Sequence, residues 1–332
     1  MLLKELGPIG ADSEPLELCE LPEPIPGKWE VRLRVRTCGV CHTELDEIEG
    51  RTPPPRLPVI PGHEVVGTVD ALGPGATRFE IGDRLGVGWI HSSSGTLTEN
   101  IDDAFIATGR DVDGGYAEYM TVPERYAHPI PEQFSDEQAA PLLCAGGVGY
   151  RALKLSGIGN RQQLGLTGFG GSAHLVLQLV RYLYPDTGVH VFARDEASRA
   201  FARSLGAAWS GDTTERAPVL LDAVIDTTPA WKPVVEALPN LRPGGRLVIN
   251  AIRKEDGDKG YLENISYETH LWMEKEIKTV ANVTAADIAE FLPLAAAVPL
   301  RPEVQIYDLE EANTALCELK AGRIRGAKVL KI

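Results

Sequence analysis

Cysteine is scarce in this chain of 332 residues. Five cysteines are too few, and odd in number, for a disulfide framework, which indicates reduced thiols that either bind metal or are simply buried. No apolar run reaches the roughly eighteen residues that a membrane-spanning helix needs. The opening MLLKELGPIGADSE also lacks the basic flank and apolar stretch of a leader peptide. We therefore expect a cytoplasmic protein with no membrane span.

Positive charge is scarce as well. The chain has 33 Lys and Arg against 47 Asp and Glu, a formal net charge of −14, and no basic stripe that would bind a phosphate backbone. A nucleic-acid partner is therefore not expected. The composition, 43% hydrophobic and 24% charged, is typical of a soluble globular protein, and the length suffices for two domains.

Two patterns divide the chain. Up to about residue 140, short alternating segments such as EVRLRVRTCGV, EVVGTVDALGPG and GDRLGVGWI are separated by Gly and Pro, which predicts a small irregular β-barrel. After LLCAGGVGYRALKL, strand and helix signals alternate: QLGLTGFG, SAHLVLQLVRYLY, GVHVFAR and DEASRAFARSLGA, the last ending at Gly206. Successive βα units predict a parallel sheet with helices on both faces, hence an α/β protein. The C-terminal helices and closing strand could complete either domain.

A glycine-rich turn opens the α/β part. GLTGFGGSAH places Gly168, Gly170 and Ala173 in a G-x-G-x-x-A pattern between a strand and a helix, with Gly171 adjacent. The first glycine permits the tight turn, the second lets the backbone approach a pyrophosphate, and Ala173 allows close helix packing. The alternative is a glycine-rich turn without a ligand, but the surrounding βαβ pattern favours dinucleotide binding.

The end of the next strand, VHVFARDE, bears on the choice of cofactor. Ala193 stands where an acid would bind the adenosine ribose, Arg194 follows it, and Arg199 lies one helical turn further on. Because arginine suits a 2′-phosphate, this pattern favours NADP(H) over NAD(H). Two alternatives stay open: Asp195 could serve the ribose if the register differs by two, and Arg194 could be an ordinary surface charge.

Metal-ligating residue types gather in the β-rich part. TCGVCHTELDEIEG and PGHEVVGTVDALG contain Cys41, His42, His63 and Glu64, and Cys144 lies at the junction with the α/β part. Thiolate and imidazole suit zinc, whose catalytic sites use three protein ligands and keep one position open. Taken singly, each has another reading: a buried thiol, a core histidine or a small apolar filler.

These segments together resemble the zinc-dependent alcohol dehydrogenases of the medium-chain dehydrogenase/reductase superfamily. GHEVVGTVDALG matches the signature G-H-E-x-x-G-x(5)-G, and CGVCHTEL, DVDGGYAEY, APLLCAGGVGYRAL, GFGGSAH and GRIRGAKVL follow the family's order. The resemblance implies a GroES-like catalytic domain (1–145 and 286–332), a Rossmann dinucleotide-binding domain (146–285), and an active site in the cleft between them.

Carried over residue by residue, the resemblance implies Cys41, His63 and Cys144 as the ligands of one catalytic zinc. The other roles it implies are Glu64 as a transient ligand, Glu44 as an acid that orients a ligand, Thr43 as the carrier of the alcohol proton, His42 and Arg325 as contacts of the cofactor pyrophosphate, and Trp89 as a wall of the substrate pocket. Acids behind metal ligands matter because they orient those ligands and tune the metal.

The sequence departs from the family pattern at two positions near this site. Many relatives have a histidine two residues beyond the acid, where this chain has Asp46; we hypothesise that Asp46 takes the outer-base role. Val148 stands where many relatives carry a threonine against the nicotinamide, so one hydroxyl contact is missing.

A third departure is a loop without cysteines. The family usually holds a structural zinc there in a C-x2-C-x2-C-x7-C arrangement, but HSSSGTLTENIDDAF offers Ser94, Leu97, Asn100 and Asp102 at about those places. We therefore expect one zinc per chain and a loop from Ser92 to Ile106 that is either held by turns and packing alone or mobile.

The sequence thus predicts an alcohol dehydrogenase or aldehyde reductase that transfers hydride between a nicotinamide cofactor and a small alcohol or aldehyde. By resemblance, we expect a homo-oligomer, a dimer or tetramer. Within the family, polyol, sugar and cinnamyl-type dehydrogenases remain alternatives, and zinc-free quinone oxidoreductase-like members are disfavoured by the ligand set. A non-catalytic nucleotide-binding relative is the alternative from another class.

Overall fold

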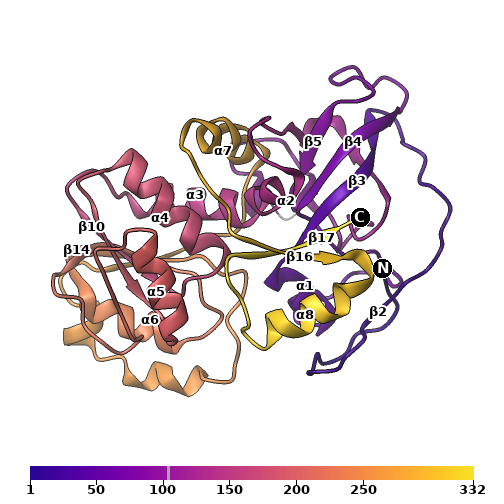
Figure 1. Ribbon diagram of the computed structural model, residues 1–332. Coiled ribbons are helices and arrows are strands. Elements are labelled where there is room, and N and C mark those ends of the chain that lie inside the picture. The colour runs from indigo at the N-terminus through magenta and orange to yellow at the C-terminus, as the bar shows by residue number, and fades with distance from the viewer. Residues whose placement is uncertain (103–104) are drawn as a thin grey trace. The chain divides into compact units, whose positions relative to one another are not determined.

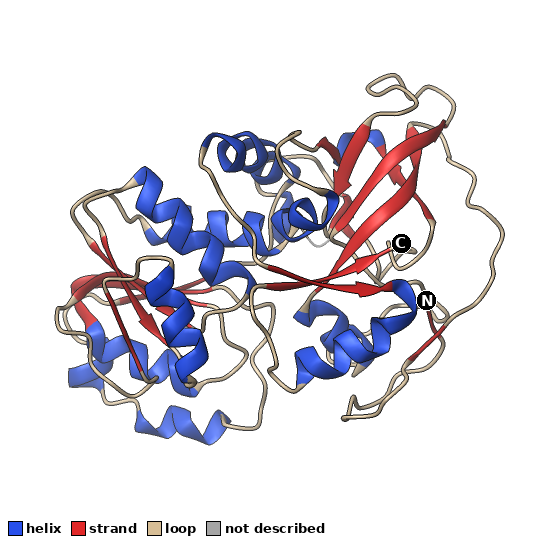
Figure 2. Ribbon diagram, viewed as in Figure 1, coloured by secondary structure: helices blue, strands red, loops and turns tan. Residues whose placement is uncertain are grey.

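The computed structural model describes residues 1–102 and 105–332, which form two compact units. The first comprises Met1–Gly147, Val283–Ala297 and Arg301–Ile332, and the second comprises Val148–Asn282 and Val298–Leu300. Figure 1 follows the chain through both units, and Figure 2 distinguishes their helices from their strands. Within the described residues, no helix has the length and apolar character needed to cross a membrane.

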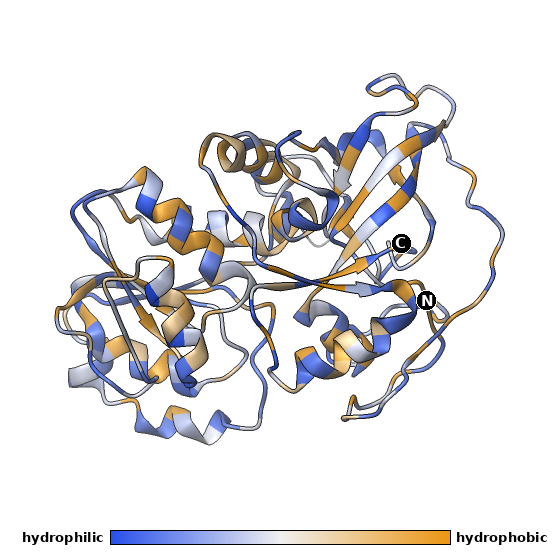
Figure 3. Cartoon of the chain, in the orientation of Figure 1, coloured by the Kyte–Doolittle hydropathy of each residue, from blue (hydrophilic) through white to orange (hydrophobic). Residues whose placement is uncertain are grey.

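The first unit is built on a seven-stranded sheet. Its order is β16-β17-β3-β4-β5-β9, with β8 also paired to β3. The strands are β3 (Glu30–Val40), β4 (Val65–Leu72), β5 (Arg84–Val87), β8 (Tyr119–Pro123), β9 (Ala127–Pro129), β16 (Val304–Asp308) and β17 (Ala327–Lys331). Burial alternates along β3, and Figure 3 shows the matching change from apolar to polar residues along these strands. Because β17 pairs antiparallel with β3, the C-terminal tail belongs to this unit.

Helices and two short ribbons complete the first unit. The helices are α1 (His42–Ile48), α2 (Asp136–Ala139), α7 (Ala285–Ala297), α8 (Ala312–Lys320) and the start of α3 (Ala145–Ser156). The ribbons pair β1 (Leu2–Leu3) with β2 (Leu16–Glu17) and β6 (Ile90–Ser92) with β7 (Ile106–Ala107). The single strand expected over GDRLGVGWI is instead the two strands β5 and β6. They separate at Gly88, where an added Cβ would lie 2.7 Å from Ile288 Cδ1.

The loop that lacks cysteines is held by buried hydrogen bonds, in addition to turns and packing. Its short 3₁₀ helix η1 (Glu99–Ile101) carries a fully buried glutamate. Glu99 Oε2 accepts a hydrogen bond of 2.9 Å from the Tyr126 hydroxyl, and Oε1 accepts one of 2.7 Å from the backbone N–H of Ala285 at the start of α7. The backbone N–H of Ser93 donates to the same tyrosine oxygen at 2.9 Å. Part of the expected loop, residues 103–104, lies outside the described residues.

The second unit is a doubly wound parallel sheet, which confirms the predicted α/β fold. The strand order is β12-β11-β10-β13-β14-β15, and every pair is parallel. The strands are β10 (Gln163–Thr167), β11 (Gly188–Phe192), β12 (Trp209–Gly211), β13 (Leu221–Asp226), β14 (Leu241–Ile249) and β15 (Glu276–Thr279). Helices α4 (Gly171–Leu183), α5 (Glu196–Ser204) and α6 (Lys232–Ala237) are grouped around them (Figure 1), and Gly206 follows α5 in a left-handed conformation.

The order of strands fixes where a ligand would bind. Chain connections reverse direction between β10 and β13, so these neighbours form the switch point of the sheet, and ligands of such sheets bind beyond the carboxyl ends of the strands there.

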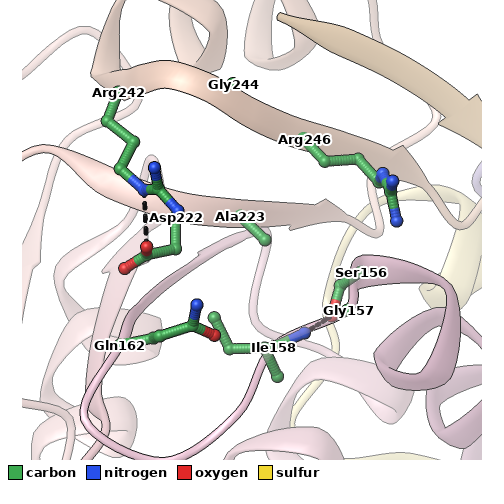
Figure 4. Close-up of a pocket in the computed structure, with 9 residues that line it drawn as sticks. All are labelled: Ser156, Gly157, Ile158, Gln162, Asp222, Ala223, Arg242, Gly244 and Arg246. Carbon is green, nitrogen blue, oxygen red and sulfur yellow. Dashed lines mark hydrogen bonds and ion pairs between the residues drawn. The ribbon is translucent and has the colours of Figure 1, made fainter.

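A cavity of about 170 Å³ lies at the amino ends of β10, β13 and β14, opposite the carboxyl ends where a ligand would bind (Figure 4). Arg242 and Arg246 line it, but Arg242 Nε pairs with Asp222 at 2.6 Å, and Arg246 Nε pairs with Glu276 at 2.8 Å. These charges are compensated internally, so the cavity does not resemble an anion site.

Candidate active site

Four potential metal ligands converge in the first unit. One ligand atom from each of Cys41, His63, Glu64 and Cys144 lies within 4.8 Å of the other three, and within the described residues no other such group of three or more His, Cys, Asp or Glu occurs. The structure therefore brings together all three residues expected as zinc ligands, together with the neighbouring glutamate.

Local folding accounts for this convergence. β3 ends at Val40, and Cys41 then begins helix α1 in an extended conformation; His63 and Glu64 immediately precede β4, which pairs with β3. A glycine is required beneath the cluster, because a Cβ on Gly39 would lie 1.8 Å from Glu64 Oε2. Cys144 follows the 3₁₀ turn η3 (Ala140–Leu143) and precedes α3.

Glu44 orients two of these residues. Its Oε1 lies 2.5 Å from His63 Nδ1, and its Oε2 accepts a hydrogen bond of 2.7 Å from the backbone N–H of Cys41. The Glu44 and His63 side chains are fully buried, and His63 Nε2 has no hydrogen-bond partner. A buried imidazole nitrogen without a partner is costly unless a ligand satisfies it, so this nitrogen fits a metal ion.

The electrostatics of the cluster also fit a cation. Contact with Cys144, followed by contact with His63, places the pKa of the Cys41 thiol well below its ordinary value, which favours the thiolate. Burial lowers the pKa of His63, but Glu44 and Cys41 outweigh burial and raise it well above its ordinary value. Burial, followed by the negative charge of Cys41, raises the pKa of Glu64 well above its ordinary value. Contact with Cys41, followed by burial, also raises the pKa of the Cys144 thiol well above its ordinary value. The acidic groups thus disfavour one another's ionised forms, and a bound cation would offset this repulsion.

The two residues expected to move the alcohol proton, Thr43 and Asp46, lie on the short helix α1. Thr43 is buried, with Oγ1 3.6 Å from Cys41 Sγ, whereas His42 is exposed. Asp46 is buried and forms an ion pair with Arg51. Burial raises the pKa of Asp46, and the hydrogen bond from Arg51 and the charge of His42 offset only part of this effect.

Trp89 and Arg325, the other residues expected at the site, also belong to the first unit. Trp89 is buried, with its ring centroid 5.2 Å from that of Phe105 and the Arg110 guanidinium 5.2 Å from its ring. The Arg325 side chain is 65% exposed, and its Nε lies 2.9 Å from Glu303 Oε1.

Glu47 is a buried carboxyl that the sequence analysis did not single out. Both of its carboxylate oxygens lack a hydrogen-bond partner, and burial, followed by the charge of Glu44, raises its pKa well above its ordinary value. Its spacing of three from Glu44 on a helix, which places both on one face, was the available signal.

The glycine-rich turn has the conformation that its sequence predicts. Gly168 follows β10 with φ +76, and a Cβ there would lie 2.9 Å from Thr228 Cγ2. Gly170 caps α4, Gly171 is the first helical residue, and Ala173 is fully buried. The turn therefore presents the N-terminus of a helix of thirteen residues at the edge of the sheet where a pyrophosphate would bind.

The charged residues that follow β11 differ in the hydrogen bonds that their side chains form. Arg194 is exposed and has no hydrogen bond or ion pair with any described residue, whereas Arg199 donates to the Ala193 carbonyl at 2.8 Å and to Glu196 at 2.9 Å. Asp195 caps α5: its carboxylate accepts from the Ser198 N–H at 2.7 Å and from the Ser198 hydroxyl at 2.8 Å. Of the three, Arg194 is left without a partner inside the unit.

Comparison with known proteins agrees with this architecture. Residues 27–132 match the alcohol dehydrogenase GroES-like domain. The chain is 41% identical to the probable alcohol dehydrogenase AdhA of Mycobacterium tuberculosis over 97% of this chain and 94% of that protein. It is 32% identical to an alcohol dehydrogenase of Geobacillus stearothermophilus over 96% of this chain and 97% of the relative.

Solved structures agree as well. The alcohol dehydrogenase of Aeropyrum pernix has a TM-score of 0.84 at 26% identity, covering 100% of this chain and 99% of that one. A Helicobacter pylori enzyme described as CAD complexed with NADP(H) shares the fold, with a TM-score of 0.85 at 22% identity over 99% and 98% of the two chains.

The fold and the sequence relatives define an oxidoreductase. More specifically, the chain belongs to the alcohol dehydrogenases of the medium-chain dehydrogenase/reductase superfamily, as the sequence resemblance predicts.

Proposed function

We propose that the protein is a zinc-dependent alcohol dehydrogenase that prefers NADP(H) and reduces small aldehydes. The observation that carries this proposal is the convergence of Cys41, His63 and Cys144, with the buried His63 Nε2 left without a partner. Bound there, zinc would supply Lewis acidity toward the substrate oxygen, and a nicotinamide cofactor would supply or accept hydride.

The residues of the chain then take distinct roles. Cys41, His63 and Cys144 hold the metal, Glu44 orients His63, and Glu64 is close enough to replace a departing ligand. Thr43 carries the alcohol proton. Because a hydroxyl is a poor base by itself, Asp46 accepts the proton beyond it. Trp89 forms part of the wall against the substrate.

The phosphate turn from Gly168 to Ala173 would hold the pyrophosphate, with His42 and Arg325 as further contacts. Arg194 would meet a 2′-phosphate, because its guanidinium is exposed and has no partner within the described residues. Arg199 is mainly engaged with Ala193 and Glu196, so it supports the Arg194 segment.

One combined experiment tests this function: zinc content per chain, together with reduction of straight-chain, cinnamyl-type and sugar aldehydes by NADPH and by NADH. One zinc per chain and faster turnover with NADPH are expected. Two zincs would refute the single-site proposal, an active zinc-free enzyme would refute the mechanism, and faster turnover with NADH would refute the role of Arg194. Full zinc occupancy and cofactor binding with no turnover of any aldehyde would indicate a non-catalytic relative.

Self-association through a sheet edge is part of the proposal. β15 lies at one edge of the second unit with all four residues exposed, and Ile277 on it is accompanied by exposed Trp272 and Met273. An exposed edge strand with unpaired backbone groups and apolar side chains beside it is a surface for pairing with a second copy. Sedimentation should show a dimer or tetramer that Ile277→Lys weakens; a monomeric native chain would exclude this arrangement.

A further inference from the structure

A buried ion pair lies at the carboxyl ends of β10 and β13. Thr167 and Asp226 are register partners that end these neighbouring strands, and the Thr167 hydroxyl donates to Asp226 Oδ1 at 2.5 Å. Lys254, on the segment after β14, pairs with the other oxygen of Asp226 and donates to the Thr228 carbonyl at 2.6 Å. The Asp226 side chain is 0% exposed and that of Lys254 is 7% exposed.

This pair is tied directly to the phosphate-binding turn. Thr167 immediately precedes Gly168, and its carbonyl accepts hydrogen bonds of 3.0 Å from the N–H and the hydroxyl of Thr227. The Thr228 hydroxyl donates to Asp226 Oδ1 at 2.8 Å, and its methyl carbon lies 2.9 Å from the position that a Cβ on Gly168 would take. The loops after β13 and β14 are thereby fixed against the first glycine of the turn.

Stability alone does not account for an ion pair at this position. Taking two charges out of water is costly, and well-packed apolar residues often serve the fold equally well or better. The Lys254 ammonium has three N–H donors, and the hydrogen bonds to Asp226 and Thr228 are its only ones within the described residues. The third N–H of Lys254 can therefore donate to a ligand at the carboxyl ends of the strands, where this fold class binds ligands.

The strand order indicates which part of a ligand this donor would meet. β11, whose end carries Arg194, lies on one side of β10, and β13 and β14 lie on the other. A dinucleotide whose pyrophosphate rests on Gly168 to Ala173 and whose adenosine extends over β11 must place its nicotinamide half over β13 and β14. Lys254 follows β14 by five residues, since that strand ends at Ile249.

We propose that Lys254, held in place by Asp226, is a cofactor-positioning residue for the nicotinamide half, where it donates to a phosphate or ribose oxygen. The role rests on the proposed dinucleotide-binding function of the second unit. Asp226 acts through Lys254 and Thr167 and does not itself touch the cofactor.

The test separates positioning from folding by comparing Lys254→Met with the double variant Asp226→Asn/Lys254→Met. Lys254→Met leaves a buried carboxylate without its counter-charge and is expected to lower Tm. The double variant removes both charges, and its asparagine still accepts from Thr167 and Thr228, so Tm should return close to the native value. NADPH and adenosine 2′,5′-bisphosphate binding would be measured by titration for both variants and for Lys254→Arg.

In the double variant, we expect the Kd for NADPH to rise about tenfold or more, the loss of roughly one charged hydrogen bond. Binding of adenosine 2′,5′-bisphosphate should change less than about twofold, because this probe lacks the nicotinamide half, and Lys254→Arg should restore part of the NADPH affinity. Native NADPH affinity in a double variant with restored Tm would overturn the proposal, as would equal losses for both probes. If the double variant does not fold, native NADPH affinity with unchanged KM in Lys254→Arg and Lys254→Met would overturn it. Failure of the native protein to bind either nucleotide would instead refute the proposed function.

Discussion

One buried side chain of the metal-ligand cluster and one of the cysteine-free loop differ in their hydrogen bonding, although both belong to the first unit. At the cluster, His63 Nε2 is buried without a hydrogen-bond partner. In the loop, both carboxylate oxygens of Glu99 are paired, one with the Tyr126 hydroxyl and one with the Ala285 N–H.

This difference distinguishes a binding site from a structural contact. Buried polar atoms are nearly always paired, so an unpaired imidazole nitrogen beside two cysteines indicates a missing ligand, whereas a fully paired carboxylate is satisfied by the fold itself. In the family, a second zinc usually stiffens this loop. Here a glutamate joins the loop to helix α7 and to Tyr126, and supplies a similar connection without a metal.

The largest effect is expected from His63→Ala. Loss of the only imidazole in the cluster should abolish zinc binding and lower aldehyde reduction on the order of a thousandfold or more. The matched control is His128→Asn, which removes another buried histidine of the same unit, outside the ligand cluster, and should retain zinc. Zinc content by elemental analysis and the reduction rate check both. Retained zinc in His63→Ala would show that His63 is not a metal ligand, and would therefore contradict the difference drawn between the cluster and the loop.

Glu99→Ala tests whether the paired glutamate of the cysteine-free loop stabilises the fold. Leaving the Tyr126 hydroxyl and the Ala285 N–H without their acceptor should lower the free energy of unfolding by about 3 kcal/mol, from two lost hydrogen bonds at about 1.5 kcal/mol each. Tyr126→Phe removes the hydrogen bond to Glu99 and the one from the Ser93 N–H, so a similar cost is expected. Denaturant unfolding measures both changes. Zinc content should stay at the native value, and a loss of zinc in Glu99→Ala would show that the loop and the cluster are not independent.

Asp46→Asn probes the proton outlet beside the cluster. Without a base beyond Thr43, alcohol oxidation at neutral pH should slow about a hundredfold, the low end for removal of general base catalysis. A base acts when ionised, so the native rate of alcohol oxidation should rise with pH through the pKa of Asp46, which burial raises, and the asparagine variant should lack this rise. A kcat profile from pH 5 to 9 measures this, and an unchanged profile would exclude Asp46 from the relay.

The sequence predicted what local patterns and motifs encode. Alternation gave the β-rich part and the βα units, the G-x-G-x-x-A turn gave Gly168 to Ala173, and the resemblance brought Cys41, His63 and Cys144 into one expected site. Local patterns do not predict contacts between distant segments: Glu99 contacts Ala285 across 186 positions, and Asp226, at the end of β13, contacts Lys254 on the segment after β14. Neither pair leaves a periodic signal, because each depends on how strands are ordered in the sheet.

The smallest effect concerns His128. Its Nδ1, like Nε2 of His63, is buried without a hydrogen-bond partner. Unlike His63, however, it has no neighbouring negative charge that raises its pKa. Burial, followed by the charge of Arg78, lowers the pKa of His128 to about 4. The unfolded chain binds this proton near pH 6.5, so the folded state is fully favoured above that pH and loses stability as pH falls toward 4. Between pH 7.5 and 5.5, this group alone should lower the free energy of unfolding by about 1.3 kcal/mol. Urea unfolding at both pH values should show that His128→Asn removes this increment, whereas the same increment in the variant would assign the pH dependence to other residues.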